Sequence, residues 1–395
     1  MREKWSIHLK VKSMIENITK KKLVVFHPSL APYRIDLFNA LNDVFDADIY
    51  LFRRQLLSQK FDVAKMEAQL NFKPKFLTTG FELYHKSRMI RFGYLHKIIL
   101  HKPDIILCSE FNLITFFSAV FAKTIFPKTE IYSLCDDSVD VAKRSSKFRK
   151  LGRFLCLKIL NGIVLGNDFA EEWYNQEFPK VPTIVAPIIQ KEERILSIIN
   201  ESNPISKRYL EKYNLKDKNI LLFVGRLVEV KNLNFLIEVF SNYVAKNKDA
   251  VLILIGDGDK KSELLKLVNN LKVQKNVIFA GRFENEELYA WYRIADYFIL
   301  PSISETFGAV VNESLIAGVP VICSNLAGAS SLINDKNGVT FDPYNKEELL
   351  NIFNELLSKK RLTKNSSSIS NSLMPFTFNK RINELITFLN HDNLD

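Results

Sequence analysis

The sequence has no long uninterrupted apolar segment and few cysteines. No stretch of its 395 residues approaches the ~20 consecutive apolar residues that a membrane-spanning helix needs. Residues 1–22 carry lysines throughout and lack the apolar core of a secretory signal, so we expect a cytoplasmic protein. Four cysteines stand singly, without a CxxC pair or a ligand-like histidine neighbour: Cys108, Cys135, Cys156 and Cys323. This pattern predicts reduced thiols rather than disulfides or a zinc site.

The composition is that of a globular protein, with 47% hydrophobic and 25% charged residues. A chain of this length exceeds one ordinary core and suits two domains of ~150 to 200 residues each.

The net charge of +11 is concentrated in the first half of the chain. Residues 1–190 hold 29 lysines and arginines against 19 acidic residues, whereas residues 191–395 hold 26 against 25. The run at 143–153, KRSSKFRKLGR, has six basic residues and no acidic one. Such a surface suits anionic lipid headgroups or nucleic acid, and a lysine-rich composition without any partner is the alternative.

Short apolar, β-branched runs alternate with helical stretches, which predicts mostly parallel sheets covered on both faces. The predicted strands are 23–27, 47–52, 75–79, 104–109, 130–135, 162–167 and 182–187 in the first half, and 219–227, 250–258, 277–283, 297–302, 320–325 and 338–343 in the second. We therefore expect a basic lead at 1–21, a Rossmann-like first domain at 22–189, a Rossmann-like second domain at 190–372, and a C-terminal segment at 373–395.

The C-terminal segment contains an amphipathic stretch at 379–389. Ile382, Leu385, Ile386 and Leu389 share one helical face there, and we expect this face to pack back on the first domain.

Ligands of such sheets bind beyond the carboxyl ends of the strands, and the strongest signal lies at one of these ends. The segment FILPSISETFGAVVNESLIAGVPVI places Glu305, Gly308 and Glu313 around an expected helix opening, where free N–H groups favour phosphate. If the segment is helical throughout, the two carboxylates are roughly 12 Å apart. That is too far for a glycosidase pair, but it suits an extended sugar nucleotide. Without further context, a helix N-terminal charge and a solvated glutamate would explain them equally well.

The flanking residues make this segment resemble the E-x7-E motif of glycosyltransferase family 4, the retaining transferases with the GT-B fold. Four more segments carry the resemblance: LFVGRLVEVKN at 222–232, LIGDG at 254–258, VIFAGRF at 277–283, and residues 338–343. The resemblance implies two facing Rossmann-like domains with an inter-domain cleft, the acceptor domain at 22–189 and the nucleotide-sugar domain at 190–372. It also implies transfer of a sugar, with retention, from a nucleotide-diphosphate sugar to a saccharide or lipid-linked saccharide, in surface polysaccharide or glycan synthesis. No cofactor besides this co-substrate is implied.

The resemblance assigns the donor diphosphate to Arg226 and Lys231, beside Gly225. A guanidinium fork and a lysine point charge suit a pyrophosphate leaving group, although a surface pair after a strand is the alternative. Glu305 then approaches the transferred sugar and Glu313 its ribose. The other donor-binding residues implied are Arg282 and Phe283 near the nucleobase, and Thr306, Phe307 and Gly308 at the helix opening. GDG at 256–258 lacks the third glycine of a dinucleotide fingerprint and predicts a tight turn.

The first half resembles the family more weakly. APYR, ending at Arg34, follows the first strand where the family usually has a glycine-rich loop over the donor phosphates. Arg34 either reaches those phosphates or lies on the surface of the next helix. Asp136 and Asp137 follow the fifth strand, where many family members have a histidine, and they either orient an acceptor hydroxyl or cap a helix. Asp136 is our catalytic candidate on this side, with His27 and Glu110 as weaker ones.

The string DDSVD at 136–140 is not read as a D-x-D metal site, because the surrounding motifs follow the GT-B pattern, so no metal is implied. The resemblance implies a front-face displacement in which Arg226, Lys231 and helix N–H groups stabilise the leaving diphosphate. Glu305 would position the sugar, and domain closure would exclude water.

Two rival functions are another sugar-nucleotide enzyme of this fold, such as an epimerase, and a non-catalytic lipid- or nucleic-acid-binding module. The second explains the basic half but leaves the ordered motifs without a role. We therefore expect as partners a nucleotide-sugar donor, a saccharide or lipid-linked acceptor, and an anionic membrane surface at which the protein is peripheral. We do not expect nucleic acid.

Overall fold

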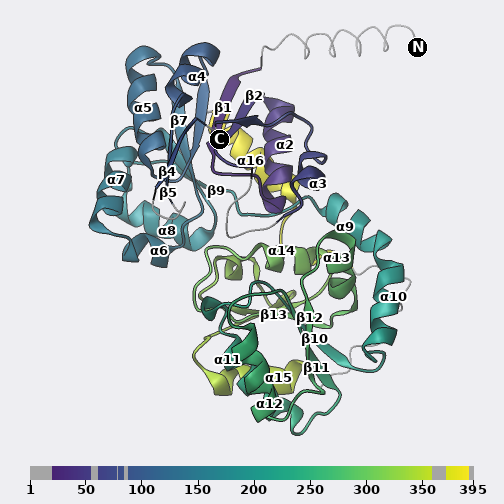
Figure 1. The fold of residues 1–395 in the computed structure, drawn as a ribbon. Helices are drawn as coiled ribbons and strands as arrows, with labels where there is room; N and C mark the ends of the chain where they lie inside the picture. The colour runs from purple at the N-terminus through teal and green to yellow at the C-terminus, as the bar shows by residue number, and fades with distance from the viewer. Residues whose placement is uncertain (1–19, 55–60, 78, 84–87, 358–370, 391–395) are drawn as a thin grey trace, which may run out of the picture.

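The computed structural model describes residues 20–54, 61–77, 79–83, 88–357 and 371–390. Two α/β domains follow one another along the chain and lie one above the other in Figure 1. Of the predicted basic lead, 1–21, only Lys20 and Lys21 are described. Within the described ranges no helix combines the length and the apolar character needed to cross a bilayer.

The first domain is built on a seven-stranded sheet with the order β3-β2-β1-β6-β7-β8-β9, in which neighbouring strands are parallel. Its strands are β1 (Lys22–His27), β2 (Asp46–Leu51), β3 (Lys75–Phe76), β6 (Ile105–Ser109), β7 (Glu130–Cys135), β8 (Gly162–Leu165) and β9 (Thr183–Val185). Its helices are η1 (Pro32–Arg34), α2 (Ile35–Val44), α3 (Val63–Glu67), α4 (Tyr94–His101), α5 (Leu113–Ile125), α6 (Val139–Arg144), α7 (Lys147–Leu157) and α8 (Asp168–Glu177). An antiparallel hairpin, β4 (Gly80–Leu83) with β5 (Arg88–Arg91), stands apart from this sheet.

The second domain is built on a six-stranded parallel sheet with the order β12-β11-β10-β13-β14-β15. Its strands are β10 (Asn219–Val224), β11 (Ala250–Ile255), β12 (Val277–Gly281), β13 (Tyr297–Leu300), β14 (Val321–Ser324) and β15 (Gly338–Phe341). Its helices are η2 (Glu229–Lys231), α11 (Leu233–Val244), α12 (Lys261–Asn270), α13 (Asn285–Ile294), α14 (Ala309–Ile316), η3 (Gly328–Leu332) and α15 (Lys346–Leu356), and α9 (Glu192–Glu201) and α10 (Asn203–Lys212) precede the sheet. A strand forms in each of the thirteen predicted runs, and the β4–β5 hairpin is the addition.

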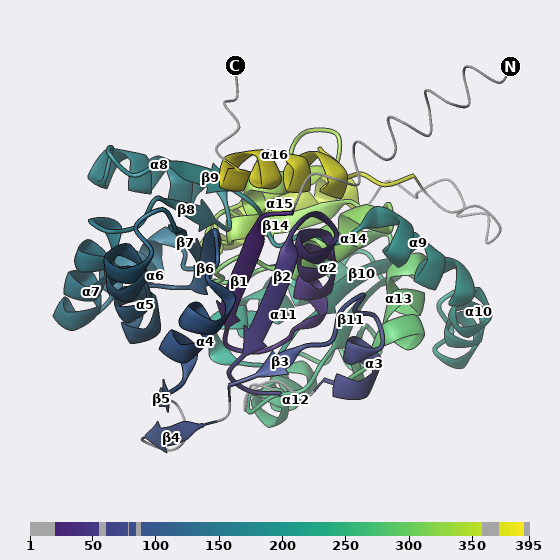
Figure 2. The same cartoon turned by 90° about the horizontal axis from the view of Figure 1, so that it is seen from above.

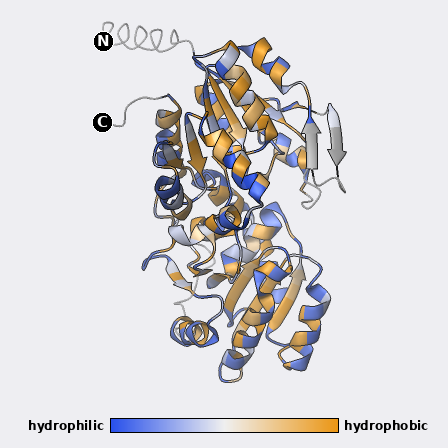
Figure 3. Cartoon of the chain, turned by 90° about the vertical axis from the view of Figure 1, so that its left-hand side faces the viewer, coloured by the Kyte–Doolittle hydropathy of each residue, from blue (hydrophilic) through white to orange (hydrophobic). Residues whose placement is uncertain are grey.

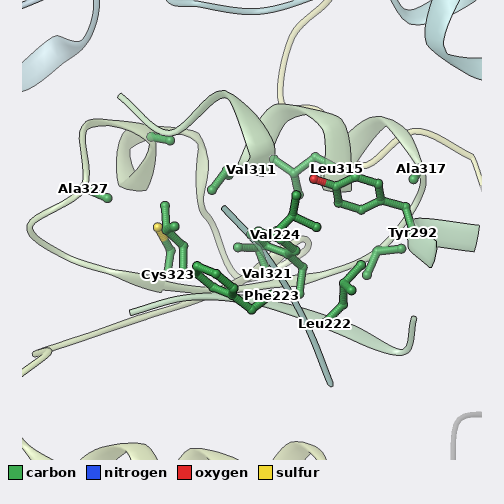
Figure 4. Close-up of a cluster of buried hydrophobic side chains, with 14 of the residues drawn as sticks. Leu222, Phe223, Val224, Tyr292, Val311, Leu315, Ala317, Val321, Cys323 and Ala327 are labelled. Carbon is green, nitrogen blue, oxygen red and sulfur yellow. The ribbon is translucent and has the colours of Figure 1, made fainter. Parts of the chain in front are cut away.

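A dense apolar core holds α14 against the second sheet, as Figure 4 shows. Val311 and Leu315 project from the helix onto side chains of β10 and β14, among them Phe223 and Val321, and all four are buried. Burying side chains of this size stabilises the fold by ~1.5 to 3 kcal/mol each, so the N-terminus of α14 is fixed relative to the strand ends.

The last helix, α16 (Phe378–Asn390), returns to the first domain and lies beside β9 and α2. Leu385 and Leu389 are buried, and the Phe388 ring lies 5.5 Å from that of Tyr132 on β7. A Cβ on Gly162 would come within 2.7 Å of Phe388, so the glycine makes room for this ring. The helix thus covers apolar surface of the first domain.

Candidate active site

The main candidate residues lie where the strand order of the second sheet reverses. Between β10 and β13 the chain goes to opposite sides of the sheet, and ligands of doubly wound sheets bind at such a switch point. The loop after β10 carries Arg226 and Lys231, and the loop after β13 carries Glu305. A backbone hydrogen bond of 3.0 Å from Ile303 N to Val230 O joins the two loops.

Lys231 and Glu305 form an ion pair across this switch point. Their side chains are largely buried, with exposed fractions of 11% and 17%. Lys231 is therefore not the surface residue that the alternative of a surface pair would require. Arg226 differs, because it is exposed and forms no ion pair or hydrogen bond through its side chain with any residue that the structure describes. Lys231 is thus held in place by the Glu305 carboxylate, whereas all the N–H donors of the Arg226 guanidinium are available to a ligand.

The GDG segment at 256–258 packs backbone against backbone with the Arg226 loop. A Cβ on Gly256 would lie 1.8 Å from Gly225 O, and one on Gly258 would lie 2.2 Å from Leu227 O, so neither position admits a side chain without movement. Leu227 N donates to Asp257 O at 2.9 Å. The segment therefore supports the loop that carries Arg226, whereas the hydrogen-bonded turn comes one step later, with Lys261 N donating to Gly258 O at 3.2 Å.

The helix α14 begins at Ala309, with Gly308 as its N-cap residue at a φ of 100°. A Cβ on Gly308 would lie 2.8 Å from the Leu300 side chain, so glycine is required by both backbone and space. Glu305 and Thr306 precede α14 and belong to the loop. The distance of roughly 12 Å between the Glu305 and Glu313 carboxylates assumed a continuous helix, so it does not apply here. The Phe307 side chain is buried in the core, so only the backbone of this residue is available to contact a sugar-nucleotide donor.

Glu313 lies on α14 in a network that sequence reasoning did not identify. Gln190 Nε2 donates to one carboxylate oxygen at 3.0 Å, and the Tyr292 hydroxyl donates to the other at 3.1 Å. Burial raises the pKa of Glu313, while these two hydrogen bonds oppose the shift. Arg194 donates to the Gln190 side chain and makes a bidentate contact with Asp36 of α2. The network therefore links α14 to the first domain.

Arg282 and Phe283 lie after β12, two strands away from β10. Arg282 is paired with Glu284 on the surface, and the Phe283 ring packs 5.7 Å from Tyr209 and 5.9 Å from Trp291. The segment that begins at Gly281 is tied toward the switch point through its backbone. Gly281 O accepts a 2.8 Å hydrogen bond from Gly256 N, and Gly256 packs on the Arg226 loop.

In the first domain the structure brings Arg34 and Asp136 together as an ion pair. Arg34 is 2% exposed, so it is not the surface residue that we considered as the alternative. Its Nε is buried without a hydrogen-bond partner among the described residues. His27, at the end of β1, lies beside it, and burial, with a contribution from Arg34, lowers the pKa of His27 to about 4. The histidine is therefore neutral at physiological pH.

Glu110 and Asp137 complete this acidic end of the first sheet. Glu110 has a positive φ of 62° and accepts a 2.9 Å bond from Asp136 N. Burial, followed by the charge of Asp137, raises the pKa of Glu110 to about 8. Asp137 pairs with Arg149 at 3.3 Å and Arg153 at 3.8 Å.

Ser138 is the residue that caps α6, so neither aspartate before it acts as the N-cap. Glu110, Cys135 and Asp137 are near enough to one another to hold a metal ion. Burial raises the pKa of the Cys135 thiol well above its usual value.

A further contact between the domains involves the loop that bears Glu305. Asn167, after β8 of the first domain, donates to Thr306 O in the E-x7-E loop at 3.4 Å. A Cβ on Gly328 would come within 2.3 Å of the same carbonyl oxygen and 2.9 Å of the Asn167 amide nitrogen. The loop bearing Glu305 is therefore packed directly against the first domain.

Comparison with known proteins shows which fold the chain adopts and which family the second domain resembles. Residues 206–371 match the family model described as glycosyl transferases group 1. The whole chain has the GT-B fold: it aligns with the crystal structure of Anabaena HepE in complex with UDP at a TM-score of 0.72 and 16% identity, covering 94% of this chain and 100% of that one. Sucrose-phosphate synthase from Thermosynechococcus elongatus aligns at a TM-score of 0.66 and 16% identity, covering 94% and 99%.

Curated relatives match in part of their length. An uncharacterized glycosyltransferase of Methanocaldococcus jannaschii is 31% identical over 170 residues, which is 40% of this chain and 43% of that protein. The alpha-monoglucosyldiacylglycerol synthase of Streptococcus pneumoniae is 29% identical over 158 residues, 38% of this chain and 36% of that protein. The chain thus matches less than half the length of these relatives.

Proposed function

We propose that this protein transfers a sugar from a nucleotide-diphosphate sugar to a saccharide or lipid-linked saccharide, with retention of the anomeric configuration. The observation that carries the proposal is the arrangement at the β10–β13 switch point, where Lys231 is held by Glu305 and the neighbouring Arg226 is uncommitted. A fixed cation beside an available guanidinium suits a diphosphate, which offers several oxygens to both.

In the proposed reaction Arg226, Lys231 and the positive end of the α14 dipole stabilise the charge that develops on the leaving diphosphate. When the donor phosphates attract Lys231, the Glu305 carboxylate is released toward the hydroxyls of the sugar. Asp136 is the proposed group on the acceptor side, held in orientation by Arg34. A donor phosphate oxygen takes the acceptor proton, and the new glycosidic bond forms on the face from which the diphosphate departs.

We also propose that the reaction needs no metal ion, because cationic side chains meet the leaving-group charge. The relatives named as glycolipid synthases favour a lipid-linked acceptor. The group 1 family match and the structural similarity to a UDP complex support a nucleotide-sugar donor.

The proposal is tested by screening sugar nucleotides for release of UDP or GDP in excess EDTA, with and without lipid-linked saccharide. Acceptor-dependent release that survives EDTA is expected. The exposed Arg208→Ala variant controls for the loss of a cation at an unrelated surface site of the second domain. Absence of any release from the whole panel, with or without added magnesium, would contradict the proposal.

A further inference from the structure

The first domain exposes an unusual number of large apolar side chains on two neighbouring helices. On α5, Leu113, Phe117 and Val120 are exposed at helical spacing, with Leu113 exposed by 65%. On α7, Phe148 and Leu151 are exposed by 88% and 54%. The two helices pack against each other, and both expose apolar side chains. Figure 3 views the molecule from this side and shows orange and blue segments alternating along the helices of the upper domain.

Basic residues surround the apolar side chains on α7. Lys143, Arg144, Lys147 and Lys150 are exposed around Phe148 and Leu151. Farther along the helix, the Lys158 ammonium lies 4.4 Å from the centre of the exposed Phe154 ring. An amphipathic helix with aromatic and aliphatic side chains flanked by lysines is the arrangement that inserts into the interface of an anionic bilayer.

Two arginines of the basic run at 143–153 form ion pairs within the protein, so composition alone does not account for the run. Arg153, whose side chain is 4% exposed, and the half-exposed Arg149 pair with Asp137 beside the proposed acceptor site. The remaining cations of the run, Lys143, Arg144, Lys147 and Lys150, are exposed. One helix thus joins the acidic end of the first sheet to the exposed surface.

We infer that the α5–α7 surface, defined by Leu113, Phe117, Val120, Phe148 and Leu151 with its lysine and arginine border, docks on an anionic lipid bilayer and inserts its apolar side chains. Charge complementarity selects the partner, because a second copy of this chain would present the same positive charge. This membrane-docking role is additional to the proposed transfer reaction and does not depend on it. If both hold, docking brings the acceptor side of the enzyme against the membrane.

Insertion and charge attraction differ in their response to salt. Attraction between exposed charges is screened within ~8 Å at physiological ionic strength, whereas burial of Phe148 in acyl chains is not weakened by salt. A surface that acts by charge alone would be released completely by high salt. An inserting surface keeps part of its binding.

The test is co-sedimentation of the full chain with vesicles of phosphatidylcholine alone or mixed with phosphatidylglycerol, at low and high salt. We expect binding to the anionic vesicles with a fraction that persists at high salt, and little binding to the neutral ones. Phe148→Ser/Leu151→Ser should lower partitioning at least tenfold without changing net charge, and Lys147→Gln/Lys150→Gln should reduce the salt-sensitive part. Matched controls in the second domain are Leu265→Ser, at another exposed apolar position, and Lys207→Gln/Lys266→Gln.

Two outcomes would overturn the inference. One is equal partitioning of wild type and Phe148→Ser/Leu151→Ser. The other is a wild-type dimer in light scattering that this variant converts to a monomer, without vesicle binding by either. Nucleotide release with a soluble acceptor, measured on the same variants, should be unchanged, so failure of docking is distinguishable from failure of the proposed reaction.

Discussion

Lys231 and Glu305, 74 residues apart in the chain, are joined in an ion pair at the opening of α14. Both side chains are mostly buried, so each is oriented by the other before any ligand arrives. Such preorganisation avoids reorganisation at the moment of reaction, which is where electrostatic catalysis gains most. The pair therefore holds the cation proposed for the diphosphate next to the carboxylate proposed for the sugar.

Replacing Lys231 by alanine should lower turnover at least tenfold, because a charge-assisted contact contributes about 1.5 to 3 kcal/mol. Glu305→Gln should lower it as well while leaving diphosphate affinity less affected. The measurement is steady-state nucleotide release, with the exposed Lys266→Ala as control. Unchanged kinetics in both site variants would exclude the assigned roles.

Arg34→Ala should destabilise the first domain by about 3 kcal/mol, because it leaves the Asp136 carboxylate beside an empty buried site. Asp136→Asn keeps a hydrogen-bond acceptor for the guanidinium and should cost less. Urea unfolding followed by circular dichroism measures the difference. Equal midpoints for Arg34→Ala and wild type would show that the pair contributes nothing to stability.

The acidic end of the first sheet should make stability depend on pH through Glu110. Since its pKa rises from 4.5 to about 8 on folding, its stabilising contribution is complete below about pH 4.5 and is lost as the pH rises to about 8. The free energy of unfolding of wild type should therefore fall relative to Glu110→Gln across this window. The exposed Glu177→Gln is the control. Parallel pH profiles for wild type and Glu110→Gln would refute the assignment.

Two glycines of the second domain allow the cost of backbone strain to be measured apart from the cost of a steric conflict. Gly281 has a φ of 96° and open space around it, so Gly281→Ala should cost ~1 to 2 kcal/mol from the backbone alone. Gly256→Ala adds a conflict with the carbonyl of Gly225, and it should cost more and also weaken diphosphate binding by displacing the Arg226 loop. Thermal unfolding and nucleotide titration distinguish the two. Equal losses in both variants would show that the close approach is unimportant.

The strands were predictable because buried parallel strands are nearly continuous apolar runs, as in AVLILI of β11. The β4–β5 hairpin was missed because GFEL and RMIR are only four residues long, too short to show a sustained apolar run. The opening of α14 was placed within two residues, because Gly308 marks a position that only glycine tolerates well.

The pairings within the site could not be predicted from the sequence. Arg34 and Asp136 are both sequence candidates, but their contact spans 102 residues and joins η1 to the residue directly after β7. The contact of Gln190 with Glu313 spans 123 residues, and no local pattern marks a single glutamine as a partner. Register and topology decide such contacts, and a single sequence does not reveal them.

The most direct test of the central claim is calorimetric titration with UDP and UMP, and with GDP and GMP, of wild type and Arg226→Ala. If Arg226 and Lys231 hold the donor diphosphate, one diphosphate should bind wild type at least tenfold more tightly than its monophosphate, and Arg226→Ala should lose most of that ratio. Arg208→Ala should keep it. A ratio that is the same in wild type and Arg226→Ala would contradict the account.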